Sequence, residues 1–259
     1  MSSPTWTHVA LSSEFRSFDG SCWRLVEAQH RISTLKLTDT LAEQAILEDL
    51  IEGAKPAIPP ECRHLDFLLA TPFRYDAIYP HGSRFRRSGR TLGVFYAAET
   101  PSTAVAEMAF YRLLFFAESP ATPWPNDAAE YTAFSAEIST SHLLDLTSQP
   151  LSRDSHIWTD LIDYTGCQTF ATAARAADAE AIRYGSVRDP AKGNNLAILT
   201  CRSFSQPSPA SRHTWRIRLS SAGVQALCEF PRHAIEFPRD AFAADPRIAA
   251  LDWDRHNPS

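Results

Sequence analysis

The apolar residues between positions 104 and 116 cover most of the circumference of a helix, which is the pattern of a buried helix. Thr100 marks its start, because its hydroxyl can accept from an unpaired backbone N–H, and Pro101 suits the first helical position. Glu107 stands inside this apolar surface. Burying a carboxylate costs several kcal/mol unless it is hydrogen-bonded or paired. We therefore expect Glu107 to be either compensated by a neighbour or kept for chemistry.

A short apolar run at positions 92–98 precedes this helix and predicts a core strand. Tyr96 lies near the C-terminal end of that strand. Strand ends that lead into a helix are places where pockets open in mixed α/β sheets. The alternative is a core aromatic ring whose hydroxyl is satisfied within the protein. The sequence leaves both interpretations of Tyr96 open.

A basic loop follows Gly82 and carries Arg84, Arg86, Arg87 and Arg90. Guanidinium forks bind phosphate with two parallel hydrogen bonds, and glycines let backbone N–H groups approach an anion. A solvated basic face is the alternative interpretation of the same spacing. Neither a Walker-type motif nor a dinucleotide G-x-G-x-x-G is present. A phosphate site in this loop would therefore rely on arginine side chains.

Further elements can be placed along the chain. Thr40 and Glu43 have the spacing of a capping box, and a wide apolar stripe predicts a scaffold helix over 41–52 that ends at Gly53. Alternation and apolar runs predict several strands, and two more segments are expected to be helical. The strands are expected at 22–26, 131–138, 142–146, 181–184, 195–199 and 215–219, and the helices at 154–163 and 167–177.

This order of strands and helices predicts an α+β fold, a single compact domain with a central mixed or antiparallel sheet flanked by helices. The 259 residues, 44% of them hydrophobic, suffice for a substantial core. We expect residues 1–19 to be irregular and residues 20–212 to form the core, with a helical insertion at about 38–60. Residues 213–259 are expected to be a C-terminal extension packed on that core.

Composition excludes several classes of function. With 25 basic and 30 acidic residues the net charge is −5, which argues against a general nucleic-acid or anionic-membrane surface. The five cysteines are odd in number and scattered, and no secretory h-region is visible, so we expect reduced thiols and a cytoplasmic protein. No apolar run is long enough for a membrane span. His-Glu-x-x-His, Cys-x-x-Cys and Gly-x-Ser-x-Gly motifs are absent, which disfavours a zinc site and a hydrolase nucleophile.

Four motifs in a fixed order resemble the RES-domain proteins, a family named for an arginine, a glutamate and a serine. They are a Gly-Ser-Arg-Phe loop at 82–85, a Val-Phe-Tyr strand at 94–96, a Thr-Ala-Val-Ala-Glu helix segment at 103–107, and Tyr-Gly-Ser-Val-Arg-Asp-Pro at 184–190. An upstream Cys-Trp-Arg-Leu at 22–25 is similar to the opening strand of the family. The resemblance spans about residues 22 to 202.

The loop departs from the family pattern at Ser83, Phe85 and Arg86, which replace a glycine, a tryptophan and an asparagine. The family's opening arginine corresponds to Arg24, but an insertion with a whole predicted helix separates it from the loop. Arg74 is a competing candidate for the same role. The sequence does not choose between these two arginines.

The resemblance implies a compact fold similar to ADP-ribosyltransferases and consumption of NAD as a substrate, with no permanently bound cofactor and no metal. The nicotinamide–ribose bond of NAD breaks with little acid catalysis, because nicotinamide leaves as a neutral base. Positive charge develops on the ribose, so a carboxylate such as Glu107 can stabilise the transition state.

The resemblance also implies roles for the remaining candidates. Arg84, which we expect to be an exposed loop residue, would clamp the pyrophosphate, and Tyr96 would stack on nicotinamide or ribose. Ser186 would bond a phosphate or ribose oxygen, although its place beside Gly185 also suits a turn serine that bonds its own backbone. The catalytic candidates are Glu107, Arg84, Tyr96 and Ser186, and the NAD-binding candidates are Arg24, Arg84, Tyr96, Ser186, Arg74 and Arg188.

Family membership would make this chain the toxin of a toxin–antitoxin pair, neutralised by an Xre-type antitoxin with a helix-turn-helix domain. DNA would be contacted only through that antitoxin, and a homodimer within the complex is compatible with the family. Phosphate, water or a protein side chain are all open as the acceptor. The alternatives are a mono-ADP-ribosyltransferase that modifies a specific protein, and a catalytically inert partner-binding module.

Overall fold

The computed structural model describes residues 6–27, 37–74 and 78–255, and it has the expected α+β architecture. An eight-stranded sheet runs in the order β1-β4-β7-β6-β5-β8-β9-β10 within this part of the chain. Strand β1 also pairs with β5, so β1, β4, β7, β6 and β5 close into a ring, in which only the β5–β6 contact is parallel. The strands are β1 Arg16–Glu27, β4 Phe95–Ala98, β5 Ala129–Asp145, β6 Ala181–Gly185, β7 Asn194–Ile198, β8 Ser211–Ser220, β9 Gly223–Cys228 and β10 His233–Pro238, with a separate pair of β2 Ile78–Tyr79 and β3 Gly89–Arg90.

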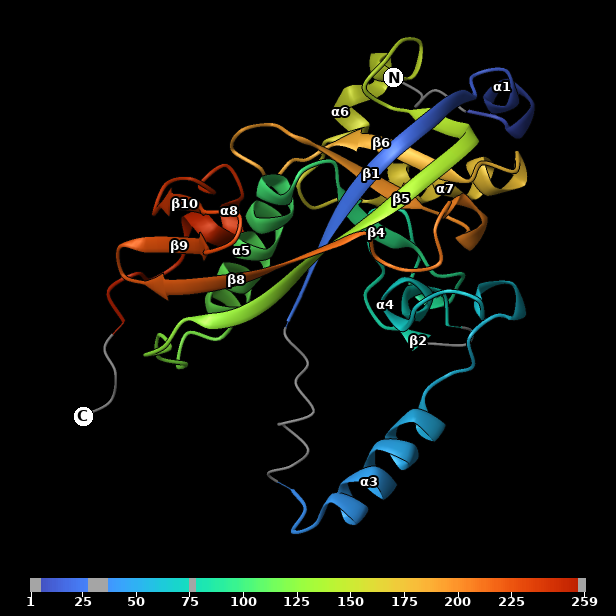
Figure 1. Cartoon of the computed structure of the whole chain (residues 1–259). Helices are drawn as coiled ribbons and strands as arrows, with labels where there is room; N and C mark the ends of the chain where they lie inside the picture. The colour runs from blue at the N-terminus through green and yellow to red at the C-terminus, as the bar shows by residue number, and fades with distance from the viewer. Residues whose placement is uncertain (1–5, 28–36, 75–77, 256–259) are drawn as a thin grey trace.

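Helices lie on both sides of this sheet (Figure 1). Helix α5 lies beside β8, β9 and β10, whereas α7 lies by the ring of strands (Figure 1). The described helices are α1 His8–Ser12, α3 Leu41–Ala54, α4 Phe67–Ala70, α5 Pro101–Glu118, α6 Ser155–Trp158, α7 Thr165–Ala176 and α8 Pro246–Ala249.

Strands β1 and β5 are longer than their sequences indicate. The expected strand at 22–26 is present but begins at Arg16, and the two strands expected at 131–138 and 142–146 form one. The expectation of an irregular segment over residues 1–19 is therefore wrong for helix α1 and for the start of β1. Residues 16–21 are mostly exposed and acquire strand structure through long-range pairing with β5, which a local pattern does not report.

The helix expected at 154–163 is only one turn long. Asp160 Oδ1 accepts from the backbone N–H groups of Ile162 (2.8 Å) and Asp163 (2.7 Å), and Asp163 Oδ1 accepts from that of Thr165 (2.8 Å). Such local side-chain bonds compete with helical ones. The result is an irregular segment between α6 and α7, which becomes important for the pocket.

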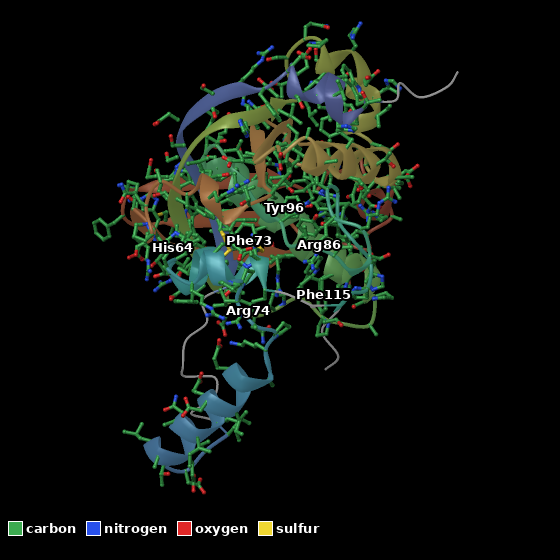
Figure 2. The ribbon with its side chains drawn as sticks, turned by 90° about the vertical axis from the view of Figure 1, so that its right-hand side faces the viewer. His64, Phe73, Arg74, Arg86, Tyr96 and Phe115 are labelled. Carbon is green, nitrogen blue, oxygen red and sulfur yellow. A yellow bond between two sulfur atoms is a disulfide. The ribbon has the colours of Figure 1, made fainter. Side chains whose placement is uncertain are left out.

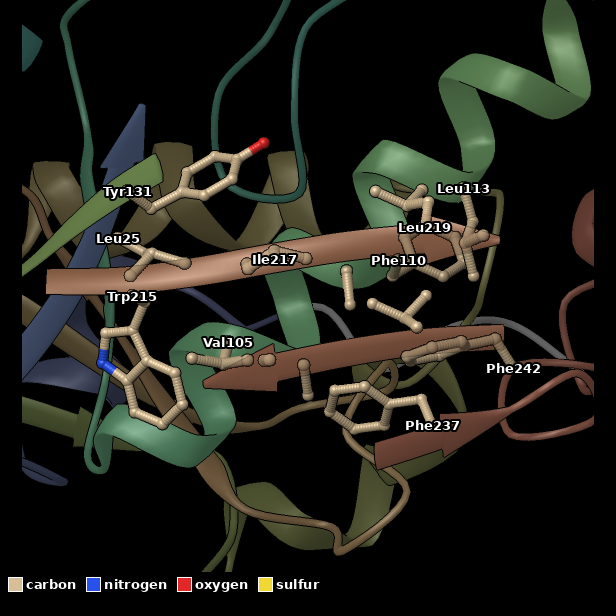
Figure 3. Packing of buried hydrophobic residues seen from close by; sticks show 14 of the residues in the cluster. Leu25, Val105, Phe110, Leu113, Tyr131, Trp215, Ile217, Leu219, Phe237 and Phe242 are labelled. Carbon is tan, nitrogen blue, oxygen red and sulfur yellow. The ribbon is translucent and has the colours of Figure 1, made fainter. Parts of the chain in front are cut away.

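Helix α5 is largely buried, as its sequence predicts, although Tyr111 and Phe115 are each 50% exposed. Its N-cap is Thr100, whose hydroxyl accepts from the N–H of Thr103 at 3.1 Å. Val105, Phe110 and Leu113 are at most 1% exposed. Figure 3 shows them packed against side chains of β8 and the C-terminal strands. Because α5 shares this core with residues beyond 213, the C-terminal part of the chain supports the helix that carries Glu107. The partners include Trp215, Ile217, Leu219, Val224, Phe237, Phe242 and Ile248.

Helix α3 begins where the capping box predicts, but it continues through Gly53 to Ala54 and does not end at Gly53 as expected. Thr40 Oγ1 accepts from Glu43 N–H, and Glu43 Oε2 accepts from Thr40 N–H, both at 3.2 Å. The expected scaffold role is wrong, because the helix extends away from the rest of the molecule (Figures 1 and 2) and Leu41, Ile46 and Leu50 are 76%, 61% and 66% exposed. Caps act locally, whereas burial of a stripe requires a tertiary partner.

The structure joins Cys62 and Cys201 in a disulfide across 139 residues, and both are buried. The expectation of reduced thiols is therefore wrong for this pair. The sequence contains no signal for it, because pairing of distant cysteines depends on which turns the fold brings together. Here the two are the 3-10 turns Pro60–Cys62 and Cys201–Ser203. Within the described ranges, no helix combines the length and apolar character required to cross a bilayer.

Candidate functional site

A pocket of about 670 Å³ lies between β1, the end of β4, helix α5 and the β6–β7 connection. Its volume is in the range of small-molecule sites. Side chains far apart in the sequence form its polar surface, and apolar residues such as Trp23, Met108 and Leu114 complete the wall. The polar and aromatic lining includes Arg24, Ser83, Arg84, Tyr96, Glu107, Tyr111, Tyr164, Tyr184, Arg188, Asn195 and Arg247.

Glu107 projects from α5 into this pocket with its side chain 22% exposed. Its Oε1 accepts from Ser186 Oγ at 2.6 Å and from Asn195 Nδ2 at 2.7 Å. Its Oε2 lies 3.9 Å from Arg188 Nη1. The carboxylate is thus both compensated by neighbours and open to the pocket. Two neutral donors fix one oxygen, and the other oxygen lies toward a cation.

Ser186 combines the two roles that its sequence left open. Its hydroxyl accepts from the backbone N–H groups of Arg188 (3.3 Å) and Asp189 (3.0 Å), as a turn serine does, while it donates to Glu107. Asp189 in turn accepts from Thr103 Oγ1 at 2.8 Å. The turn after β6 is therefore fastened to the start of α5. This connection fixes the position of Ser186 relative to the carboxylate.

Arg188 is a buried cation beside Glu107. Its guanidinium carbon lies 4.3 Å from the ring centre of Phe110 and 4.9 Å from that of Tyr111, and Nη2 donates to Tyr164 Oη at 2.5 Å. Burial alone would lower the pKa of Arg188, but Tyr111, Tyr164 and Glu107 together raise it above its ordinary value. Arg188 therefore keeps its positive charge although it is only 7% exposed.

Tyr96 is the second residue of β4, not at its C-terminal end as expected, but it does line the pocket. Its hydroxyl accepts from the N–H of Phe85 at 2.9 Å and is 2.8 Å from Ser83 Oγ. These contacts hold the loop at 82–85 against the sheet. The interpretation of Tyr96 as an aromatic residue with a satisfied hydroxyl is thus correct for its oxygen, and its place in the pocket wall is also as predicted.

The expectation of Arg84 as an exposed loop residue is wrong, because it is 5% exposed. Its Nη1 donates to the carbonyl of Trp158 at 2.7 Å and its Nη2 to that of Asp160 at 2.9 Å, while the guanidinium lies 4.6 Å from the ring centre of Tyr164. These carbonyls belong to the irregular segment between α6 and α7. Arg84 therefore holds the pocket wall together through the protein's own backbone, and it also lines the pocket.

The other arginines of this loop whose side chains are described also bond residues of the protein itself. Arg86 is buried, and its Nε and Nη2 donate to Thr91 at 3.1 and 2.8 Å. Arg87 is exposed and donates to Thr169 Oγ1 at 3.1 Å. The side chain of Arg90 is outside the described part. Arg84, Arg86 and Arg87 thus make hydrogen bonds within the protein that hold the loop in place.

Arg24 and Arg74 are clearly distinguished by their surroundings. Arg24 lines the pocket from β1 and donates from Nη1 to the carbonyl of Tyr96 at 3.1 Å. Arg74 is not part of the pocket wall. It donates to the carbonyl of Pro56 at 2.8 Å and pairs with Glu52 of α3 (Figure 2 shows Arg74). The placement of Arg74 at the site is therefore wrong, and of these two arginines it is Arg24 that lines the pocket.

Sequence reasoning missed several pocket residues, among them Asn195, Tyr164 and Arg247. Asn195 was assigned only to a strand, although a polar residue at the start of an apolar run is a signal for a site. Tyr164 and Arg247 lie in segments without a recognisable motif, and only the fold brings them to the pocket. Tyr184, already quoted as part of a motif, is buried, and burial raises its pKa well above the ordinary value, so it remains a neutral hydroxyl.

Cysteine chemistry is disfavoured at this site. Burial raises the pKa of Cys22 to about 12 and also raises that of Cys167, whose thiol lies near Arg84. Neither residue is a thiolate at neutral pH. Among the residues that the structure describes, no group of three or more His, Cys, Asp or Glu side chains is arranged to hold a metal ion.

Comparison with protein families matches residues 58–220 to the RES domain, which is more than half of the chain. The chain belongs to the RES domain family. The match contains Glu107, Ser186, Arg188 and Asn195, but strand β1 with Arg24 lies before it, and α8 lies after it. This RES protein therefore completes its pocket with segments on both sides of the matched region.

A search of curated proteins found no match. Among solved structures, the protein is similar to a chain in the crystal structure of the M. tuberculosis MbcT–MbcA toxin–antitoxin complex. The identity is 14%, the TM-score is 0.43, and the alignment covers 88% of this chain and 92% of that one. A likeness of this degree does not transfer residue roles.

Proposed function

We propose that this RES protein is the toxin of a toxin–antitoxin pair and that it cleaves NAD at the nicotinamide–ribose bond. The observation that carries the proposal is the arrangement of Glu107, whose carboxylate opens into a substrate-sized pocket while Ser186 and Asn195 fix one of its oxygens. A negative charge that is already oriented stabilises a developing cation without a reorganisation cost.

In this proposal Glu107 faces the ribose, where positive charge develops as nicotinamide departs as a neutral base. Nicotinamide leaves with the electron pair of the broken bond, a free electron pair of the acceptor forms the new bond at the same carbon, and an acceptor that carries a proton, such as water, releases it to solvent. Arg188 and Arg24 supply positive charge for the diphosphate of the substrate, because both line the pocket. Arg84 and Tyr96 hold the loop that closes one side of it.

An antitoxin is the proposed protein partner. The support is membership of the RES family. An Xre-type protein with a helix-turn-helix domain remains our expectation for its class. DNA contact by this chain itself is not part of the proposal, because the net charge of −5 supplies no general basic surface.

The first test is incubation of the purified full-length protein with NAD in the presence and absence of inorganic phosphate. Release of nicotinamide is followed by liquid chromatography, and the remaining product identifies the acceptor. ADP-ribose indicates water, a phosphorylated ADP-ribose indicates phosphate, and label on protein indicates ADP-ribosyl transfer. Absence of nicotinamide under all conditions, from protein folded by circular dichroism, would reject NAD cleavage and favour a binding module.

Glu107→Gln keeps the shape of the side chain but removes its charge. We expect the rate of nicotinamide release to fall by about 10²–10³-fold, the effect of removing a group that stabilises charge in a transition state. Glu130→Gln serves as a control, because Glu130 lies on β5 outside the pocket wall and pairs with Arg216 at 3.9 Å. Equal rates in the two variants would remove Glu107 from the chemistry.

Asn195→Asp tests whether Asn195 positions that carboxylate. It replaces a donor 2.7 Å from Glu107 Oε1 with a second carboxylate, which disfavours ionisation of the pair. We expect a lower rate and an acidic limb of the pH–rate profile displaced to higher pH. Asn194→Asp is the matched control, because the neighbouring Asn194 donates to Glu99 at 3.1 Å and is outside the pocket wall. Identical pH profiles would contradict a positioning role.

A further inference from the structure

Arg247 is a pocket residue supplied from outside the matched RES region. It lies in α8, 27 residues beyond the end of the match at residue 220, and its side chain is 33% exposed. Helix α8 is attached to the core through Ile248, which is 1% exposed and belongs to the same cluster as Phe110 of α5. The position of Arg247 in the pocket wall is therefore set by core packing and not by a loose C-terminal tail.

Asp245 holds the guanidinium of Arg247 in one orientation. Nε donates to Oδ1 at 2.9 Å and Nη2 donates to Oδ2 at 2.7 Å, while the backbone N–H of Arg247 also donates to Oδ1, at 3.0 Å. Asp245 itself is only 3% exposed. Among the described residues, Nη1 of Arg247 has no hydrogen-bond partner. A pre-oriented guanidinium with an unused edge in a pocket wall is suited to bind an anion.

Arg188 and Arg247 approach the same aromatic ring. Their guanidinium carbons lie 4.3 and 5.8 Å from the ring centre of Phe110, which Figure 3 shows within the core beside Phe242. The hydrogen bonds that Arg247 donates to Asp245 raise the pKa of Arg247, and the charge of Arg188 opposes this effect. Two guanidinium groups beside one ring bring positive charge to the same part of the pocket wall, where an anion can contact both.

We propose that Arg247 and Arg188 form a subsite for a phosphoryl group, and that the C-terminal segment thereby determines which anions this RES protein binds. Arginine at both positions matches the planar, bidentate recognition of phosphate oxygens. The identification of this anion as the diphosphate of a dinucleotide rests on the proposed function. The subsite itself rests only on the geometry of the two arginines. A free phosphate that acts as the acceptor has the same chemistry and is the second source.

Isothermal titration of the full-length protein with ADP-ribose, and separately with inorganic phosphate, tests the subsite. Arg247→Gln should weaken the binding of the preferred anion by about tenfold or more, as expected for the loss of a charged hydrogen bond. Arg239→Gln is the matched control, because Arg239 also lies in the C-terminal segment and pairs with Asp254 at 2.7 Å, but it does not line the pocket. It should change either affinity by less than about twofold.

Arg247→Lys covers the case in which the glutamine variant does not fold. Lysine keeps a positive charge beside Asp245 but lacks the second edge of the guanidinium, so binding should weaken while the melting temperature stays near that of the wild type. If the variant binds ADP-ribose more weakly, the ligand of the subsite is the diphosphate of the dinucleotide. If it binds only inorganic phosphate more weakly, the ligand is the phosphate that acts as the acceptor. Unchanged binding of both anions in the Arg247 variants, or no binding of either by the wild type, overturns the subsite.

Failure of the subsite and failure of NAD cleavage remain distinguishable. Wild-type protein that binds ADP-ribose in an Arg247-dependent manner, but releases no nicotinamide from NAD, would reject the reaction and keep the subsite. Protein that releases nicotinamide with the same Michaelis constant in wild type and Arg247→Lys would keep the reaction and reject the subsite.

Discussion

Replacement of Arg84 by alanine removes a buried guanidinium that holds two segments of the pocket wall together. The wild-type side chain donates to the carbonyls of Trp158 and Asp160 at 2.7 and 2.9 Å and lies over Tyr164. Hydrogen bonds from a charged group contribute about 1.5–3 kcal/mol each, and a stacked cation adds roughly 0.5–2 kcal/mol. Because Asp160 is exposed and its carbonyl can regain water, we expect a loss near the lower limit, about 3–4 kcal/mol.

This loss can be measured by urea unfolding and by thermal melting of the full-length protein. For a chain of this size each kcal/mol shifts the melting temperature by about 2–4 °C, so Arg84→Ala should melt roughly 10 °C below the wild type. Arg87→Ala is the matched control from the same loop, because Arg87 is exposed and makes one hydrogen bond, to Thr169. It should lose at most about 0.5 kcal/mol.

The two measurements also separate the structural role of Arg84 from a phosphate clamp. A clamp in an exposed loop would change the binding of ADP-ribose and leave the melting temperature unaltered. Equal melting temperatures for the Arg84 and Arg87 variants would refute the structural role, because they would mean that the two carbonyl contacts contribute little to folding.

The remaining predictions concern pH and redox state. Burial tends to raise the pKa of Asp145, but hydrogen bonds from Thr147 and Ser148 outweigh it and lower the pKa below 3.8. The ionised Asp145 therefore contributes stability that is present above its unfolded-state pKa and is lost as the pH falls through its folded-state pKa. In Asp145→Asn we expect the free energy of urea unfolding to fall less steeply with decreasing pH below pH 5 than in the wild type. An equal slope in the two proteins would contradict this prediction. The disulfide between Cys62 and Cys201 closes a loop of 139 residues. Its reduction should therefore lower the free energy of unfolding by at most about 4–5 kcal/mol. Alkylation of all five cysteines in unfolded, unreduced protein would show that the bond does not form.

Local signals in the sequence were sufficient to predict two helices. The N-cap at Thr100 and the apolar surface that follows it define α5, and the capping box of Thr40 and Glu43 defines the start of α3. These signals act within one turn of the chain, so no distant residue is needed to recognise them. The ordered motifs likewise predicted one shared site for Glu107, Tyr96 and Ser186; the structure places Glu107 and Tyr96 in the pocket wall and Ser186 in hydrogen bond with Glu107.

The partners of charged and polar side chains were decided by the tertiary structure. Glu107 and Asn195 are 88 positions apart, and Arg84 reaches carbonyls more than 70 positions away. An arginine in a glycine-bounded loop has the same local pattern whether it binds phosphate or the backbone of a neighbouring segment. Only the position of that neighbouring segment distinguishes the two roles. The segment is irregular because the Asp160 side chain bonds nearby backbone N–H groups that a helix would otherwise use.

The sequence by itself thus determined the α+β class, the starts of the two capped helices and Glu107 as a partly buried carboxylate of α5 that lines the pocket. The tertiary structure decided that Arg24 and not Arg74 lines the pocket, that two distant cysteines pair, and that a C-terminal arginine, Arg247, reaches the pocket wall. The physical reason is the distance along the sequence over which each kind of contact acts. Caps and periodicity arise from contacts within a few residues, whereas pockets, ion pairs and disulfides form wherever long-range packing brings separate segments together.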